Sequence, residues 1–320
     1  MSDTVKFECV AGPFDGPANG VAWDGEGLLF ALMEAQRLMR LDPATGDVSE
    51  VRKYTSRTNG IALGMNGELY GGQEASRRLI EFLPDGSSHA IDALLDGKHH
   101  NHPCDLSVDS SGAIWFADAF SPVLAVGPQF FPPLDHASVL RVAKDHRRAW
   151  VMRRMTYDTK APRAVLVSAD EKTLYVAEGE PRHGHVRELR AYPIGADGEL
   201  GNYTVLHTFG ADGRGPQRGI AGMCLDAEGN IVACGGWSRN GPGALVYVFS
   251  PNGAVLESWP LPADMPNRCA FGGADLDTLY VTTAAGELLA GRTPRLRADS
   301  QGRLTGNGCR SCGGRQQSSI

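Results

Sequence analysis

The chain has 320 residues, with 31 basic and 37 acidic side chains and a formal net charge of -6. This balance argues against a nucleic-acid-binding surface. No apolar run is long enough to span a bilayer, and no basic-then-apolar signal segment opens the chain. We therefore expect a cytoplasmic protein with no membrane or nucleic-acid partner, whose oligomeric state the sequence leaves open. The cysteines number seven, and we expect most to be reduced and buried.

One hairpin pattern recurs six times along the chain. Each copy has a short apolar strand, a Gly/Asp turn and a second strand rich in β-branched and aromatic residues. The copies lie roughly forty to sixty residues apart and begin at Asn19, Asn59, Cys104, Arg163, Ala221 and Asn267. The 40 glycines and 19 prolines suit many tight turns. The repeat predicts one closed all-β domain, a six-bladed β-propeller.

The predicted elements follow this repeat in chain order. Residues 5–10 alternate in polarity, and we expect this strand to form the outer edge of the last blade, which removes an open sheet edge. The blade strands are predicted at 20–24, 28–33, 37–41 and 48–54; at 60–63, 68–72, 78–83 and 88–91; at 105–108, 113–117, 138–143 and 149–155; within 165–209; within 223–259; and at 269–271 and 278–284.

Two segments fall outside this pattern. Residues 120–137 form a long insertion rich in proline and aromatic residues, which we expect to be an ordered lid. Residues 294–320 are rich in Arg, Ser, Gly and Gln without periodicity and are predicted to be a flexible tail. The propeller domain is accordingly predicted to span residues 1–293.

A propeller places its small-molecule site at the face where the inner strands begin, because a concave channel there is surrounded by rigid strands. The residues that open the inner strands should therefore form a ring: Asn19, Asn59, Cys104, Arg163, Ala221, and Asn267 or Arg268. Loops near residues 73–74, 118–120, 178–185 and 235–240 should surround it.

The most specific repeat sequences are Cys-Ala-Phe-Gly-Gly-Ala-Asp-Leu-Asp-Thr-Leu-Tyr-Val-Thr-Thr-Ala at 269–284 and Ser-Ala-Asp-Glu-Lys-Thr-Leu-Tyr-Val-Ala-Glu at 168–178. With them, nearly the whole stretch from Asn19 to Ala285 resembles the SMP-30/gluconolactonase/luciferin-regenerating family of six-bladed propellers. The resemblance implies a lactone hydrolase with one divalent cation, Ca²⁺ or Zn²⁺, in the channel. It implies that a Glu, an Asn and an Asp at inner-strand starts hold this ion.

This chain departs from the family pattern at those positions. Asn19-Gly-Val stands for the family's Glu-Gly-Pro, Cys104 for an Asn, Arg163-Ala for Asn-Gly, and Ala221-Gly for Asp-Gly. Because a divalent cation binds through carboxylate or carbonyl oxygens, these replacements should abolish the site. We therefore predict no metal and no cofactor.

The polar residues of the ring leave alternatives open. Arg163, Arg218 and Arg268 could bind an anionic substrate, or could pair with Asp118, Glu178 or Glu180. Asn19 and Asn59 precede glycine, which indicates either a positive-φ turn or an amide that lines the cavity. Cys104 follows a histidine and could be a nucleophile or a packed thiol.

Four titratable residues are candidates for acid–base catalysis. Asp118 and Glu178 end second strands at the channel mouth, where either could be the general base or only a cap or ion-pair partner. His102 and His185 belong to two histidine clusters near the same face and could act as acid–base groups, hold a transition metal or have no specific role.

The favoured hypothesis is a hydrolase for a small, anionic lactone or cyclic ester that works without the family's cation, with Arg163 stabilising developing negative charge. The alternatives are a metal-free lyase, isomerase or condensing propeller, and a non-catalytic propeller that binds a ligand. Fold alone does not choose among them.

Overall fold

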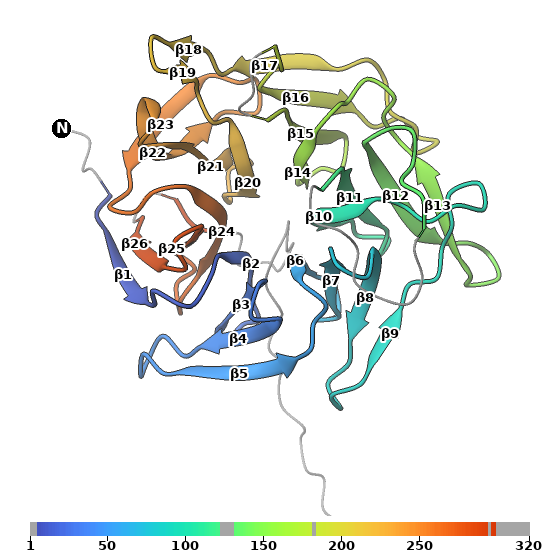
Figure 1. The fold of residues 1–320 in the computed structure, drawn as a ribbon, viewed down its shortest axis with the longest axis horizontal. Coiled ribbons are helices and arrows are strands. Elements are labelled where there is room, and N and C mark those ends of the chain that lie inside the picture. Colours follow the sequence, from blue (N-terminus) through green and yellow to red (C-terminus); the bar gives the residue numbers. More distant parts are fainter. Residues whose placement is uncertain (1–4, 122–130, 181–183, 294–295, 299–320) are drawn as a thin grey trace, which may run out of the picture.

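The computed structural model describes residues 5–121, 131–180, 184–293 and 296–298. These residues form six four-stranded antiparallel sheets arranged in a ring around a central axis (Figure 1). No helix occurs in the described ranges, and so none there could span a membrane. The predicted six-bladed β-propeller is confirmed.

Each of the first five blades uses four consecutive strands. Blade one holds β2 (Ala18–Trp23), β3 (Leu28–Leu32), β4 (Arg37–Leu41) and β5 (Val48–Lys53); blade two holds β6 (Thr58–Leu63), β7 (Leu69–Gln73), β8 (Arg78–Phe82) and β9 (Ser88–Ala90). Blade three holds β10 (His102–Val108), β11 (Ile114–Ala119), β12 (Ser138–Lys144) and β13 (Trp150–Arg154); blade four holds β14 (Pro162–Val167), β15 (Thr173–Glu178), β16 (Glu188–Pro193) and β17 (Thr204–Thr208). Blade five holds β20 (Ile220–Leu225), β21 (Ile231–Trp237), β22 (Asn240–Phe249) and β23 (Val255–Pro260), preceded by a small hairpin of β18 (Ala211–Asp212) and β19 (Gly215–Pro216).

The sixth blade closes the ring with both ends of the described chain. It combines β24 (Pro266–Gly272), β25 (Thr278–Thr283) and β26 (Leu288–Arg292) with the N-terminal strand β1 (Phe7–Ala11). Strand β1 runs antiparallel to β26, with Phe7 opposite Gly291 and Cys9 opposite Leu289, and the two lie side by side in Figure 1. The predicted closure by the N-terminal strand is therefore confirmed.

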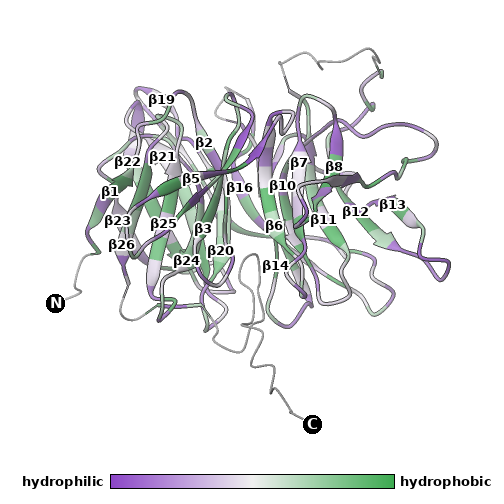
Figure 2. Ribbon diagram, turned by 90° about the horizontal axis from the view of Figure 1, so that it is seen from below, coloured by the Kyte–Doolittle hydropathy of each residue, from purple (hydrophilic) through white to green (hydrophobic). Residues whose placement is uncertain are grey.

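The hydrophobic core is divided among the interfaces between neighbouring blades. Six clusters of buried side chains are present, one at each interface. Successive strand residues point to opposite faces, so on β11 Phe116 packs toward blade two and Trp115 toward blade four. Inner and second strands are buried on both faces, which explains their continuous apolar runs; Figure 2 shows these hydrophobic strands between polar loops.

The repeated aspartate of the hairpins has a local structural cause. The side chain of Asp109 accepts hydrogen bonds from the backbone N–H groups of Ser111 and Ala113, and Asp226 accepts them from Glu228 and Asn230. These contacts stabilise the tight turn between the first and second strands. They explain why Asp is favoured at such turns. The turn motif therefore shapes the blade at the end of the channel away from the predicted ring.

Parts of the predicted insertion and tail lie outside the described residues. Of the insertion, residues 120–121 and 131–137 are described; Asn101 accepts a hydrogen bond from the backbone N–H of Leu134 at 2.8 Å, which anchors the second half. Residues 122–130 of the predicted lid are not described. Of the predicted tail, only residues 296–298 are described, and Leu296 and Ala298 pack against the core between blades five and six.

Candidate active site

A β-bulge interrupts the inner strand of every blade at the same end of the channel. The pairing of inner and second strands shifts between residues 18 and 21, 58 and 61, 103 and 105, 162 and 164, 220 and 222, and 266 and 269. These positions contain the ring predicted from the sequence. A bulge leaves a residue outside the strand ladder and redirects it, so the fold presents a residue from each blade at the mouth.

The glycines of the ring are required by close approach of neighbouring inner strands. A Cβ atom on Gly20 would lie 2.6 Å from the carbonyl oxygen of Asn59, and one on Gly60 would lie 2.9 Å from the Cα atom of Asp105. Neither glycine has a positive φ. The interpretation of Asn-Gly as a positive-φ turn is therefore wrong, because the small residue is needed for packing about the axis.

Arg268 occupies the centre of this ring. Its side chain comes from β24 of blade six and reaches Asp105 on β10 of blade three, directly across the ring in Figure 1; the Nε–Oδ1 distance is 2.9 Å. Its Nη1 atom donates to the carbonyls of Ala221 and Asn267, and its Nη2 atom donates to the carbonyl of Cys104 at 2.7 Å. Arg268 is only 8% exposed. It closes the channel below the mouth.

Arg218 is also buried and engaged. It donates to the carbonyls of Pro266 and Gly236 at 2.7 and 3.3 Å and to the side chain of Asn267 at 3.1 Å. Burial, followed by the charge of Arg163, lowers the pKa of Arg218 to about 10. The contacts of Arg218 and Arg268 indicate structural roles, and their predicted contact with substrate stays a prediction.

Arg163 differs from these two arginines. Its side chain is exposed at the bulge of blade four and makes no ion pair or hydrogen bond with any described residue. The side-chain amides of Asn19 and Asn59 likewise have no hydrogen-bond partner within the described ranges. The backbone carbonyl of Arg163 lies 3.5 Å from Nη2 of Arg268, so these two residues are neighbours. Among the described residues, the mouth therefore offers the exposed guanidinium of Arg163 and two unpartnered amides, of which that of Asn19 is buried and that of Asn59 is half-buried.

The two carboxylates predicted as bases hold the loops that lead into the inner strands. Asp118 is fully buried; one oxygen accepts from the backbone N–H of Asn101 at 2.7 Å, and the other lies 3.3 Å from Nδ1 of His100. Glu178 is 3% exposed and accepts from the N–H groups of Lys160 and Ala161. Burial raises the pKa of Glu178. These contacts favour a capping role, and a catalytic role stays a prediction.

The predicted nucleophile and bases are spread over the same face. The Cys104 sulfur lies 3.4–3.7 Å from the carbonyl oxygens of Ala117, Pro162 and Arg163, and burial raises its thiol pKa to about 12, which indicates a packed thiol. His102 opens β10; both ring nitrogens are buried, and neither makes a hydrogen bond of normal geometry with a described residue. Burial, followed by the charge of Arg77, lowers the pKa of His102. His185 is exposed on its loop, and the neighbouring His183 lies outside the described residues.

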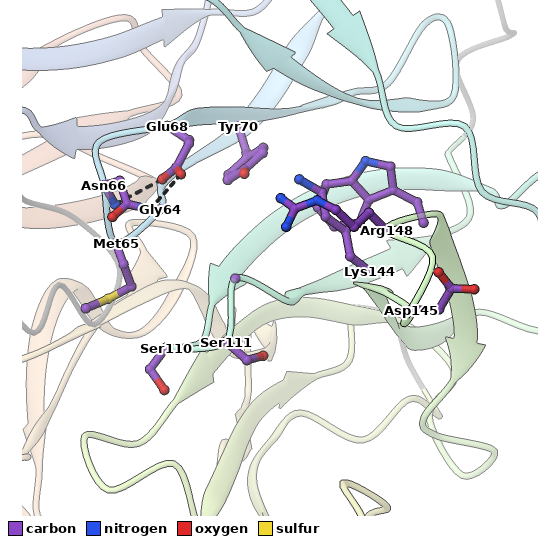
Figure 3. Close-up of a pocket in the computed structure, with 12 residues that line it drawn as sticks. Gly64, Met65, Asn66, Glu68, Tyr70, Ser110, Ser111, Lys144, Asp145 and Arg148 are labelled. Carbon is purple, nitrogen blue, oxygen red and sulfur yellow. Dashed lines mark hydrogen bonds between the residues drawn. The ribbon is translucent and has the colours of Figure 1, made fainter.

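The structure has a small cavity at the axis of the ring and a larger one away from it. At the axis, a cavity of about 20 Å³ lies around Asp105 and Arg268, which is room for a single water molecule. A larger cavity of about 360 Å³ lies between blades two and three, at the opposite end of the inner strands (Figure 3). There Glu68 is bonded to Asn66, and the Lys144 ammonium lies over the Trp150 ring. Glu68 and Lys144 already have partners there, whereas the ring brings together residues from all six blades, so the ring is the better candidate site.

The fold is that of a six-bladed propeller with polar groups converging on its axis, which makes the channel mouth its candidate small-molecule site. Residues 17–285 match the SMP-30/Gluconolactonase/LRE-like region, and the chain belongs to that family. The family resemblance and the lactonase-like enzyme class are confirmed.

Similar proteins agree with this assignment. A 6-deoxy-6-sulfogluconolactonase from Pseudomonas putida is 31% identical over 80% of this chain and 79% of its own length. A pentonolactonase from Haloferax volcanii is 25% identical over 84% of this chain and 81% of its own. A solved gluconolactonase from Xanthomonas campestris superposes with a TM-score of 0.75 at 26% identity, covering 91% of this chain and 90% of that chain.

Proposed function

We propose that the protein hydrolyses a sugar-acid lactone that carries an anionic substituent, such as a sulfonate, and that it does so without a divalent cation. The observation that carries this proposal is the exposed guanidinium of Arg163, which has no partner among the described residues and belongs to a residue in contact with Arg268. A guanidinium fork suits a sulfonate, carboxylate or phosphate. The Pseudomonas putida relative, named for a sulfonated lactone, supports the same choice.

The remaining ring groups have roles that follow from their chemistry. The free amides of Asn19 and Asn59 can donate to the lactone carbonyl as it gains negative charge. His102 has a lowered pKa and is therefore neutral near pH 7, so it can accept a proton from the attacking water. Water adds to the carbonyl carbon, the ring C–O bond breaks, and the ring oxygen leaves as a hydroxyl. The product is an open-chain acid.

A matched substrate panel tests the proposal. Proton release should be measured with a neutral aldonolactone and with the same lactone carrying a sulfonate, phosphate or carboxylate. We expect the highest kcat/KM for an anionic substrate. No acceleration above spontaneous opening for any lactone would refute hydrolysis, and a clear preference for the neutral lactone would refute the role of the positive mouth.

A further inference from the structure

The family's cation does not fit the residues of this hub. Asn19, Cys104, Arg163 and Ala221 stand at the positions where the resemblance implies ligands. In the part of the chain that the structure describes, no group of three or more His, Cys, Asp or Glu side chains is arranged to hold a metal ion. The axial cavity of about 20 Å³ is too small for a hydrated divalent ion.

The oxygen atoms at the axis are instead directed at Arg268. The carbonyls of Cys104, Arg163 and Ala221 belong to bulges, which release them from the strand ladder. All three accept from the guanidinium of Arg268, the one of Arg163 at 3.5 Å, while Asp105 supplies a carboxylate. Four blades, three to six, thus meet on one side chain.

We propose that Arg268 is a built-in cation that takes the place of a metal ion at the hub and excludes one. An arginine remains charged at any physiological pH and brings five donors in a fixed plane. Here Nη1 and Nη2 serve four carbonyls and Nε faces Asp105. No donor of Arg268 is left for substrate, so Arg268 is a positioning residue that fixes the ring from which Arg163 projects.

This inference deepens the proposed function, because it explains how the hub is held without a cation. It is tested by metal binding and not by turnover, so the two can fail separately. Purified full-length protein is treated with EDTA, its metal content is determined by elemental analysis, and Tm is measured with added Ca²⁺, Mn²⁺ or Zn²⁺. We expect no stoichiometric metal and no shift in Tm.

The variant Arg268→Met tests whether the guanidinium is what excludes the ion. It frees four carbonyl oxygens and the Asp105 carboxylate, an oxygen set suited to Ca²⁺. We expect a lower Tm that rises on addition of Ca²⁺, and no rise in the double variant with Asp105→Asn. If Arg268→Met does not fold, Arg268→Lys should fold with a lower Tm and still bind no Ca²⁺.

Two results would overturn the proposal. A divalent ion bound at one equivalent in the wild-type protein, or a fall of its Tm on chelation, would show that the hub holds a metal after all. A folded Arg268→Met protein whose Tm does not respond to any of the three ions would show that Arg268 is not what keeps cations out.

Discussion

The carboxylate of Asp105 accepts a hydrogen bond from the backbone N–H of Val165 at 3.0 Å, across the interface between blades three and four. Its other oxygen faces Arg268. One buried carboxylate therefore joins its own blade to its neighbour and to the blade opposite. Burial raises the pKa of Asp105 to about 6, against the opposing effect of the Arg268 charge.

This arrangement predicts an unusual pH dependence of stability. A carboxyl group whose folded pKa lies above its unfolded value of 3.8 binds a proton more tightly in the folded state. The contribution of Asp105 to the free energy of unfolding is therefore fully present below about pH 4 and is lost as the pH rises through 6. At pH 7 we expect Asp105→Asn to cost about 3 kcal/mol, because it leaves the Arg268 charge unpaired. The difference in the free energy of unfolding between the wild-type protein and Asp105→Asn, measured with urea, should increase as the pH falls from 6 to 4. A difference that decreases over this range would contradict the assignment.

Arg163→Gln tests the anion site. We expect kcat/KM for an anionic lactone to fall roughly 10- to 100-fold, since a charge-assisted hydrogen bond contributes about 1.5–3 kcal/mol. Tm should not change, because the side chain is exposed and has no partner among the described residues. Arg153→Gln is the matched control, since Arg153 is 64% exposed on outer strand β13. Equal losses for neutral and anionic lactones would argue against charge recognition by Arg163.

Two variants of Glu178 distinguish a capping role of its carboxylate from a catalytic one. Glu178→Gln keeps an oxygen that can accept from Lys160 and Ala161, so stability and kcat should stay near the wild-type values. Glu178→Ala removes that acceptor and should cost about 2 kcal/mol by urea unfolding, because two N–H groups lose their partner. Loss of kcat in a fully folded Glu178→Gln protein would restore the carboxylate as the base.

His102 should control the acid limb of the pH profile. Because its pKa is lowered from 6.5, kcat/KM should hold its plateau below pH 6.5 and fall only as the imidazole is protonated. His102→Gln should lower kcat by about 100-fold or more and abolish that limb. His89→Gln, on the exposed outer strand β9, is the control. An unchanged acid limb in the His102 variant would assign the proton transfer to another group.

Gly60→Ala tests the tight packing of the ring. The added methyl group would lie 2.9 Å from the Asp105 Cα atom and 3.0 Å from the carbonyl oxygen of Cys104. Overpacking of this kind costs about 1–3 kcal/mol. Gly210→Ala, with no atom within 4 Å of its added Cβ, should be near neutral by the same urea assay. Equal stability of the two variants would mean that neighbouring inner strands can move apart.

The sequence by itself determined the six-bladed β-propeller fold. Alternating hydrophobicity, turn signals and a sixfold repeat are local properties, so they gave the blade strands and the ring of residues from Asn19 to Arg268. They also gave the closure by the N-terminal strand, since an unpaired edge needed a partner. The positions at which the family holds its cation lie at fixed places in this repeat. The different residues at these positions in this chain could therefore be read from the sequence alone.

Only the tertiary structure decided what each ring residue does. From the sequence, the same two roles were predicted for Arg163, Arg218 and Arg268, because nothing in their neighbouring residues distinguishes three arginines at the channel mouth. In the fold, Arg268 crosses to blade three and Arg218 is buried among carbonyls, whereas Arg163 alone stays free of described partners. Asp105 gave no sequence signal beyond following Cys104. The partners of these groups lie in other blades, tens to more than a hundred residues away, and only ring closure brings them within bonding distance.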